Sequence, residues 1–201
     1  MKRRWFLVAL ASVPGGTAQA QLRSLVTGEV LRGRFKQERQ LKGFDRPLIS
    51  TGDFVLDHGL GLIWRTEQPF SIMTVITAAG LVQSIDGAET TRLAAVRLPF
   101  LARLYDLLGA ALSGDWRALD KLFQVTRQGD AGHWEIGLVP QAGADSLAMP
   151  LRSVTLRGGQ FLDEAKIVRL DGDTDQLVFS DQSLGSPLTD AEARRLHDAG
   201  K

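Results

Sequence analysis

The sequence predicts a mainly β protein: one antiparallel meander of about eleven strands, with helical insertions. Apolar and polar residues alternate with a period of two along most of the chain. Short turn-forming segments separate the alternating stretches, as in an antiparallel meander. One apolar stretch with helical spacing interrupts the alternation near the middle of the chain. If the sheet curls, this helix can plug or lid its concave face, and the apolar residues there form either a cavity for a long apolar ligand or an ordinary sealed core.

The alternating stretches define the expected strands and their faces. Residues 30–39 place Leu31 and Phe35 on one face, and residues 48–57 place Phe54 and Leu56 on one face and Val55 on the other. The dipeptide at 86–87, Asp-Gly, is a strong hairpin signal. The expected strands are 30–39, 48–57, 62–64, 70–77, 81–85, 89–93, 122–127, 134–139, 151–156, 161–170 and 177–180.

Three helices are expected outside these strands. Pro99 suits the first turn of a helix over residues 98–112, whose apolar stripe is Leu101, Leu104, Leu108 and Leu112. Asp115 can cap a short second helix that contains Trp116. The segment Thr-Asp-Ala-Glu at 189–192 has the capping-box pattern, which predicts a polar surface helix over 190–198.

Composition limits the class of protein. The chain has 201 residues, no cysteine and a formal net charge of +1, which excludes disulfide scaffolds, thiolate metal sites and cysteine nucleophiles. Residues 1–20 combine a basic start, a short apolar run and an Ala-Gln-Ala site, so we expect a secretory signal peptide followed by one domain over 21–201. Three of the 24 basic residues fall in that peptide, which leaves the mature chain mildly acidic. Nucleic acid is therefore not an expected partner.

The residues that usually carry catalysis form no convincing group. His58, His133 and His197 lack metal-ligand spacing, and no serine sits in a nucleophile elbow. The acidic segment 171–175 lacks the glycine and glutamate of an EF-hand loop, so we predict a tight turn there. We expect no enzymatic activity, no cofactor and no bound metal. The basic residues Arg32, Arg34, Lys36 and Arg39 are assigned to one strand face, either a solvated face or a docking surface.

The order of several short motifs resembles the LolA-like family of periplasmic outer-membrane lipoprotein carriers. The segment 33–37, Gly-Arg-Phe-Lys-Gln, is similar to the first-strand F-x-Q motif of that family. The segment 50–54, followed by Trp64 and Pro69, is similar to its G-x-L/F, W and P pattern. The resemblance covers residues 28–182 and is closest to the divergent members of the family. Asp57-His58-Gly59 stands where the family usually has an arginine before a proline that helps to close the lid, so lid control or cargo would differ.

The resemblance implies a half-open antiparallel β-barrel of about eleven strands, with helices over its concave face as a lid. It also implies a periplasmic, monomeric carrier of a Gram-negative bacterium that binds acyl chains of lipoproteins, or another lipid, in that concave face. Its implied partners are an inner-membrane ABC transporter and an outer-membrane acceptor. The absence of cysteine favours the soluble carrier over the lipid-anchored acceptor. The lipid-binding residues expected on the sheet are Phe35, Phe54, Leu56, Leu62, Trp64, Ile72 and Met73. Those expected from the lid are Leu101, Leu104, Leu108 and Trp116.

Three other functions remain open at this stage. The chain could carry a different lipid or a polyene product of a biosynthetic cluster, which genome neighbourhood would reveal. It could be a periplasmic lipid or lipoprotein sensor module, although such proteins usually add a second domain. It could be a lipid hydrolase, in which case substitution of His58 or Asp57 would abolish activity.

The lid assignment leads to a first prediction. A charged residue at Leu104 or Leu108, such as Leu104→Glu, should abolish ligand retention while the sheet stays folded, because the charge would oppose burial against an apolar chain. Mass spectrometry of the purified variant measures the retained ligand, and circular dichroism shows whether the sheet is folded. Lipid that co-purifies at the wild-type level would contradict the lid assignment.

Overall fold

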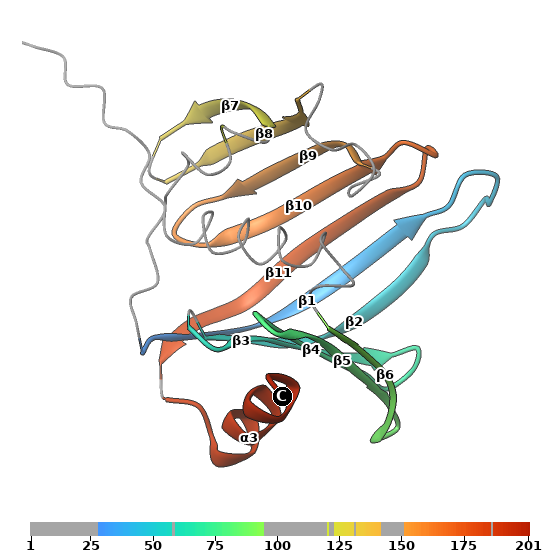
Figure 1. Ribbon diagram of the computed structural model, residues 1–201. Coiled ribbons are helices and arrows are strands. Elements are labelled where there is room, and N and C mark those ends of the chain that lie inside the picture. The colour runs from blue at the N-terminus through green and yellow to red at the C-terminus, as the bar shows by residue number, and fades with distance from the viewer. Residues whose placement is uncertain are drawn as a thin grey trace, which may run out of the picture.

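One open antiparallel sheet and one helix make up the described part of the chain. The structure is a computed structural model that describes residues 28–57, 59–94, 120, 123–130, 132–141, 151–185 and 187–201. Its eleven strands form a single sheet, followed by a helix near the C-terminus (Figure 1). The elements are β1 (Val30–Gln40), β2 (Leu48–Asp57), β3 (Gly61–Gln68), β4 (Ile72–Thr77), β5 (Gly80–Ile85), β6 (Ala88–Ala94), β7 (Phe123–Gly129), β8 (Trp134–Pro140), β9 (Leu151–Gly158), β10 (Leu162–Arg169), β11 (Thr174–Gly185) and α3 (Asp190–Ala199).

The fold class predicted from the sequence is confirmed, although several strands, β3 and β11 most of all, are longer than expected. β11 was expected only over 177–180 but runs from Thr174 to Gly185. Its pairing with β1 shifts register near Asp181, which has a φ of 52°. This irregularity breaks the alternation, so the sequence pattern shows only part of the strand. The predicted signal peptide and both predicted middle helices lie outside the described residues.

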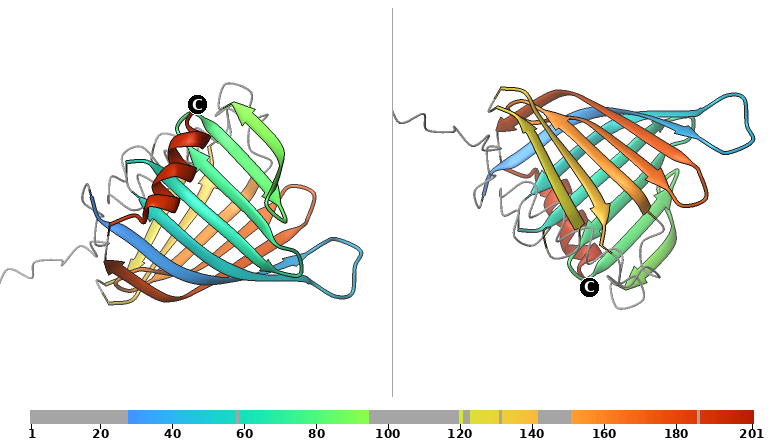
Figure 2. Two further views of the ribbon diagram at one scale, coloured as in Figure 1. Left: turned by 90° about the horizontal axis from the view of Figure 1, so that it is seen from below. Right: turned by 90° about the horizontal axis from the view of Figure 1, so that it is seen from above.

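The strand order shows how the sheet is left open. The order is β6-β5-β4-β3-β2-β1-β11-β10-β9-β8-β7, so the first and last strands pair in the middle and β6 and β7 form the two edges. The sheet curls so that its two halves lie opposite each other (Figure 2). Because β6 and β7 do not pair, the barrel is half-open.

α3 covers the part of the outer face that β3, β4 and β5 form. Apolar residues of the strands and of α3 make up the outer cluster, defined as Val30, Val55, Ile63, Val75, Leu196 and Ala199, all of which are buried. Leu196 and Ala199 are three residues apart on one side of α3, which contacts β3, β4 and β5. Figure 2 places α3 outside the curve of the sheet. The surface helix expected over 190–198 is therefore present, and two apolar positions seat it on the sheet.

Polar contacts fix both the start and the position of α3. The predicted capping box is present, since the Thr189 hydroxyl accepts from the Glu192 backbone N–H and the Glu192 carboxylate accepts from the Thr189 backbone N–H. Arg32 of β1 forms a 2.8 Å ion pair with Glu192 and donates to the carbonyl of Pro187 at 3.2 Å. The middle strand of the sheet thus holds the segment that leads into α3.

On the inner face, two glycines make room for two phenylalanine rings. β1 and β2 each contain a Gly-x-Phe sequence, and the antiparallel register sets Gly33 opposite Phe54 and Phe35 opposite Gly52. A Cβ atom on Gly33 would lie 2.7 Å from the Phe54 ring, and one on Gly52 would lie 2.9 Å from the Phe35 ring. Each ring therefore lies over the glycine of the neighbouring strand, an arrangement that compensates for the missing side chain.

Gly52 gives the second prediction. A Cβ atom there would also lie 1.8 Å from the Arg65 carbonyl oxygen of β3, so Gly52→Ala forces β2 and β3 apart. We expect a loss of about 2–3 kcal/mol in the free energy of unfolding, measured by urea titration. Gly185→Ala is the matched control, because open space surrounds that position in β11. Equal losses in the two variants would show that the close approach at Gly52 is unimportant.

Candidate functional site

Four aromatic rings from four strands meet on the inner face. We call them the aromatic floor: Phe35 of β1, Phe54 of β2, Trp64 of β3 and Phe179 of β11. Phe35 stacks on Trp64 with 3.8 Å between ring centroids, and Phe179 meets Phe54 edge-on at 5.7 Å. Phe35 and Phe54 are buried, whereas Trp64 and Phe179 are only half-buried. The floor thus presents aromatic surface that an apolar ligand can cover.

Most of the sheet residues predicted for lipid binding surround this floor. Leu56 is buried in the same cluster as Phe54, and Leu62 packs against that cluster from β3. Ile72 shares their face because it lies opposite Thr66, two residues beyond the Trp64–Thr74 pair. The predicted lid residues Leu101, Leu104, Leu108 and Trp116 lie outside the described residues.

Met73 is the one described member of the predicted set that lies elsewhere. It packs against the outer cluster under α3. Ile72 and Met73 are adjacent in β4, and adjacent strand residues point to opposite faces, so they could not both line the inner face. Met73 therefore packs on the outer face, and not on the inner face where it was predicted to bind lipid.

A second apolar group on the same face was missed from the sequence. Phe123, Trp134, Ile136 and Leu138 are buried together on β7 and β8, with Val154 and Leu156 of β9 packed against them. The register joins this group to the inner face, because Ile136, Leu156, Ala165 and Leu177 follow one another across β8 to β11. The alternation at 134–138 was the available signal. Apolar inner surface therefore extends from β4 to β7.

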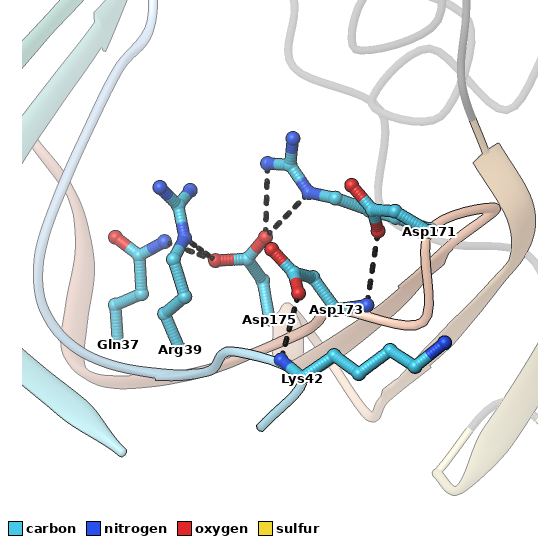
Figure 3. A network of polar contacts seen from close by, with 7 residues as sticks. Gln37, Arg39, Lys42, Asp171, Asp173 and Asp175 are labelled. Carbon is cyan, nitrogen blue, oxygen red and sulfur yellow. Dashed lines mark hydrogen bonds and ion pairs between the residues drawn. The ribbon is translucent and has the colours of Figure 1, made fainter. Parts of the chain in front are cut away.

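A buried carboxylate and its partners form a polar group at one end of this surface. We call it the inner polar cluster: Gln37, Arg39, Arg169 and Asp175 (Figure 3). Asp175 is 2% exposed. One of its oxygens accepts from Gln37 Nε2 at 2.8 Å and from Arg39 Nε at 2.6 Å, and the other accepts from Arg169 Nε at 3.2 Å and Nη2 at 3.0 Å. Each carboxylate oxygen therefore accepts two hydrogen bonds.

The inner polar cluster also corrects the predicted basic stripe. Arg39 is an odd number of residues from Arg32, Arg34 and Lys36, so it lies on the inner face while they lie on the outer face. On the outer face, Arg34 pairs with Glu67 at 2.8 Å and Lys36 pairs with Glu38 at 2.6 Å. The three outer residues thus form a charged, ion-paired surface.

Burial and hydrogen bonding act in opposite directions on the pKa of Asp175. Burial by itself raises the pKa of this carboxyl group, because the charged form loses its hydration. The hydrogen bonds from Arg39 and Gln37, the charge of Arg39 and the hydrogen bond from Arg169 outweigh burial, and the pKa lies below its ordinary value. Asp175 is therefore ionised at neutral pH.

The acidic segment 171–175, which ends at Asp175, forms the predicted tight turn between β10 and β11. Arg169 N–H donates to the Asp173 carbonyl at 2.9 Å, and the Asp171 carboxylate accepts from the Asp173 N–H. The Asp173 carboxylate accepts from the backbone N–H of Lys42, which ties this turn to the β1–β2 connection. Within the described ranges, no group of three or more His, Asp or Glu side chains is placed to hold a metal ion. His133 lies in the β7–β8 turn and His197 in α3, and His58 falls outside the described residues.

Comparison with known proteins gives a family match. A family model described as "Outer membrane lipoprotein carrier protein LolA-like" matches residues 16–191. No curated protein matches the chain. Similar solved structures include a LolA superfamily protein from Nitrosomonas europaea, with 8% identity, a TM-score of 0.43 and coverage of 85% of this chain and 91% of the other. Another is a DUF1329 family protein from Desulfovibrio piger, with 7% identity, a TM-score of 0.42 and coverage of 82% and 89%. Over the described part of the chain, no helix has the length and apolarity needed to cross a membrane.

Asp175 gives the third prediction. Because its folded-state pKa lies below the unfolded value of about 3.9, the ionised group stabilises the fold above that pH, and the contribution is lost as the pH falls through the folded-state pKa. The free energy of unfolding of Asp175→Asn should therefore be about 2 kcal/mol lower than that of the wild type at neutral pH. Urea titrations over a pH series should show this difference shrinking below a pH of about 4. A difference that stays constant with pH would contradict the assigned charge state.

Proposed function

Because the chain belongs to the LolA-like family of outer membrane lipoprotein carrier proteins, we propose that it shields acyl chains on the inner face of its half-open barrel. The observation that carries the proposal is the single apolar face formed by the aromatic floor and the group around Trp134. The cargo is the acyl part of a lipoprotein or of another lipid. The proposed role is binding and transport, without chemistry on the cargo.

The two faces of the sheet support this role in different ways. α3 supplies a permanent apolar cover for the outer cluster, where Val30 is 1% exposed and Leu196 is 2% exposed. On the inner face Leu62, Trp64 and Phe179 keep part of their surface accessible. Burial of a methylene group is worth about 0.8 kcal/mol, so an acyl chain laid along this surface escapes a large cost of exposure to water.

Exposed apolar side chains gather at one end of the sheet and fit an exchange of cargo there. The turns after β1, β3, β5 and β10 all lie at this end, because alternate hairpins of a meander turn on the same side. The exposed residues at or beside these turns are Phe44, Leu48, Ile49, Phe70, Ile85 and Leu170. Large exposed apolar side chains at one edge of a protein are available for contacts with another protein or a lipid. We place the contacts with the donor and the acceptor at this end.

The proposed setting is the periplasm. Residues 1–20 would direct export, an inner-membrane ABC transporter would load the monomeric carrier, and an outer-membrane acceptor would unload it. The helix expected over 98–112 would close over the cargo. These steps extend the family assignment to this chain and are tested by localisation of the protein and by cross-linking to its partners.

A second candidate cargo is a lipid other than a lipoprotein. It is favoured by Asp57, which stands where the family usually has an arginine upstream of the tryptophan. The Asp57 carboxylate accepts from the backbone N–H groups of Gly59 and Leu60, at 2.8 and 2.9 Å, and so shapes the β2–β3 turn. Native mass spectrometry of the protein purified from the periplasm distinguishes the two cargoes, because a lipoprotein adds a peptide mass and a free lipid does not.

Ile72 and Met73 provide the fourth prediction as a matched pair. They are neighbours in β4, both half-buried, and they lie on opposite faces. Ile72→Glu should reduce co-purified lipid at least about tenfold, because a charge on the inner face opposes burial of an acyl chain. Met73→Glu should keep its lipid, and thermal unfolding of both variants controls for stability. Equal lipid content in the two variants would refute binding on the inner face.

A further inference from the structure

The inner polar cluster carries more positive than negative charge. Two guanidinium groups, Arg39 and Arg169, share the single buried carboxylate of Asp175. The carboxylate is 2% exposed, whereas the side chains of Arg39 and Arg169 are 40% and 34% exposed. The solvent-accessible part of the cluster therefore consists of the Arg39 and Arg169 side chains and not of the carboxylate.

Each guanidinium keeps donors that Asp175 does not use. Arg39 bonds to Asp175 through Nε, and its two terminal nitrogens make no hydrogen bond to another described residue. In Figure 3 these terminal nitrogens point away from Asp175. Arg169 uses Nε and Nη2, which leaves Nη1. The fixed fork of a guanidinium suits the paired oxygens of a phosphate or a carboxylate.

The register places this cluster in line with the aromatic floor. Along β1 and β11 the inner-face pairs are Phe35 with Phe179, Gln37 with Leu177, and Arg39 with Asp175. Arg39 is four positions beyond Phe35, a distance of roughly 14 Å along an extended strand. A hydrocarbon chain on the floor would thus reach the two guanidinium groups with its polar end.

We propose that Arg39 and Arg169 bind the anionic headgroup, a phosphate or a carboxylate, of an amphiphile whose hydrocarbon chain lies on the aromatic floor. This inference rests on the proposed carrier function and names the class of its cargo. Asp175 acts as a positioning residue, because it holds both guanidinium groups at the end of the apolar surface. The turn carboxylates Asp171 and Asp173 accept from backbone N–H groups and belong to the connection beyond the strands.

The test compares two amphiphiles that share one chain. Wild-type protein freed of co-purified lipid is titrated calorimetrically with dodecyl phosphate and with dodecanol, below their aggregation concentrations. We expect dodecyl phosphate to bind at least about tenfold more tightly, because a hydrogen bond to a charged group contributes about that factor. Arg39→Gln and Arg169→Gln should each weaken dodecyl phosphate binding and leave dodecanol binding unchanged.

Arg34→Gln is the matched control. It removes an arginine of the same strand that forms an ion pair on the outer face, so the preference for the anionic amphiphile should persist. Inorganic phosphate alone should compete poorly, since it has no chain for the floor. Effective competition by inorganic phosphate would overturn the headgroup assignment in favour of a free-anion site.

The outcomes separate this inference from the carrier function. Equal binding of the two amphiphiles to the wild type would show that the cluster is a structural ion pair only, and would leave the carrier function standing. Failure of both to bind would refute the carrier function itself. The wild-type comparison needs no variant, so it decides the matter even where an arginine substitution unfolds the protein.

Discussion

The pairing of β1 with β11 is the contact on which the rest of this structure depends. β1 pairs with β2 on one side and with β11 on the other, so it joins the strands β2 to β6 to the strands β7 to β10. Without this pairing the chain would form two separate small sheets, each with an apolar face exposed. With it, the aromatic floor gains Phe179, and Asp175 comes within reach of Arg39. The pairing joins residues far apart in sequence, so the inner face exists only after the ends of the meander have met.

The two faces of this sheet have different apolar partners. The outer cluster is closed by α3, which Thr189, Glu192 and Arg32 hold in place. On the inner face the half-buried rings of Trp64 and Phe179 keep accessible surface at the centre of the curl. A permanent cover on one side and accessible apolar surface on the other is the asymmetry that a carrier requires. The outer cover stabilises the fold, while the inner surface is the one on which we propose that an acyl chain binds.

The inner polar cluster adds a defined end to this apolar surface. A carboxylate as buried as Asp175 is stable only because Gln37, Arg39 and Arg169 satisfy its oxygens. The same contacts hold two guanidinium groups on the inner face, where their positive charge marks one end of the path along β1. The cluster therefore makes one end of the inner face charged and leaves the rest of the face apolar. It also links β1, β10 and β11 next to their turns.

Alternation and turn chemistry are local properties, so the sequence alone predicted the order of the strands, most of the turns and the face of most strand residues. For the same reason the Gly-x-Phe sequences at 33–35 and 52–54 and the capping box of α3 can be recognised in the sequence. The predicted face was wrong for Met73 and for Arg39, because each was grouped with residues an odd number of positions away on the same strand. The three-dimensional structure was needed to show that Phe35 lies over Gly52 and that Arg39, Arg169 and Asp175 form one cluster. These contacts depend on the register between distant strands, and register is set by the packing of whole faces, which no local pattern records.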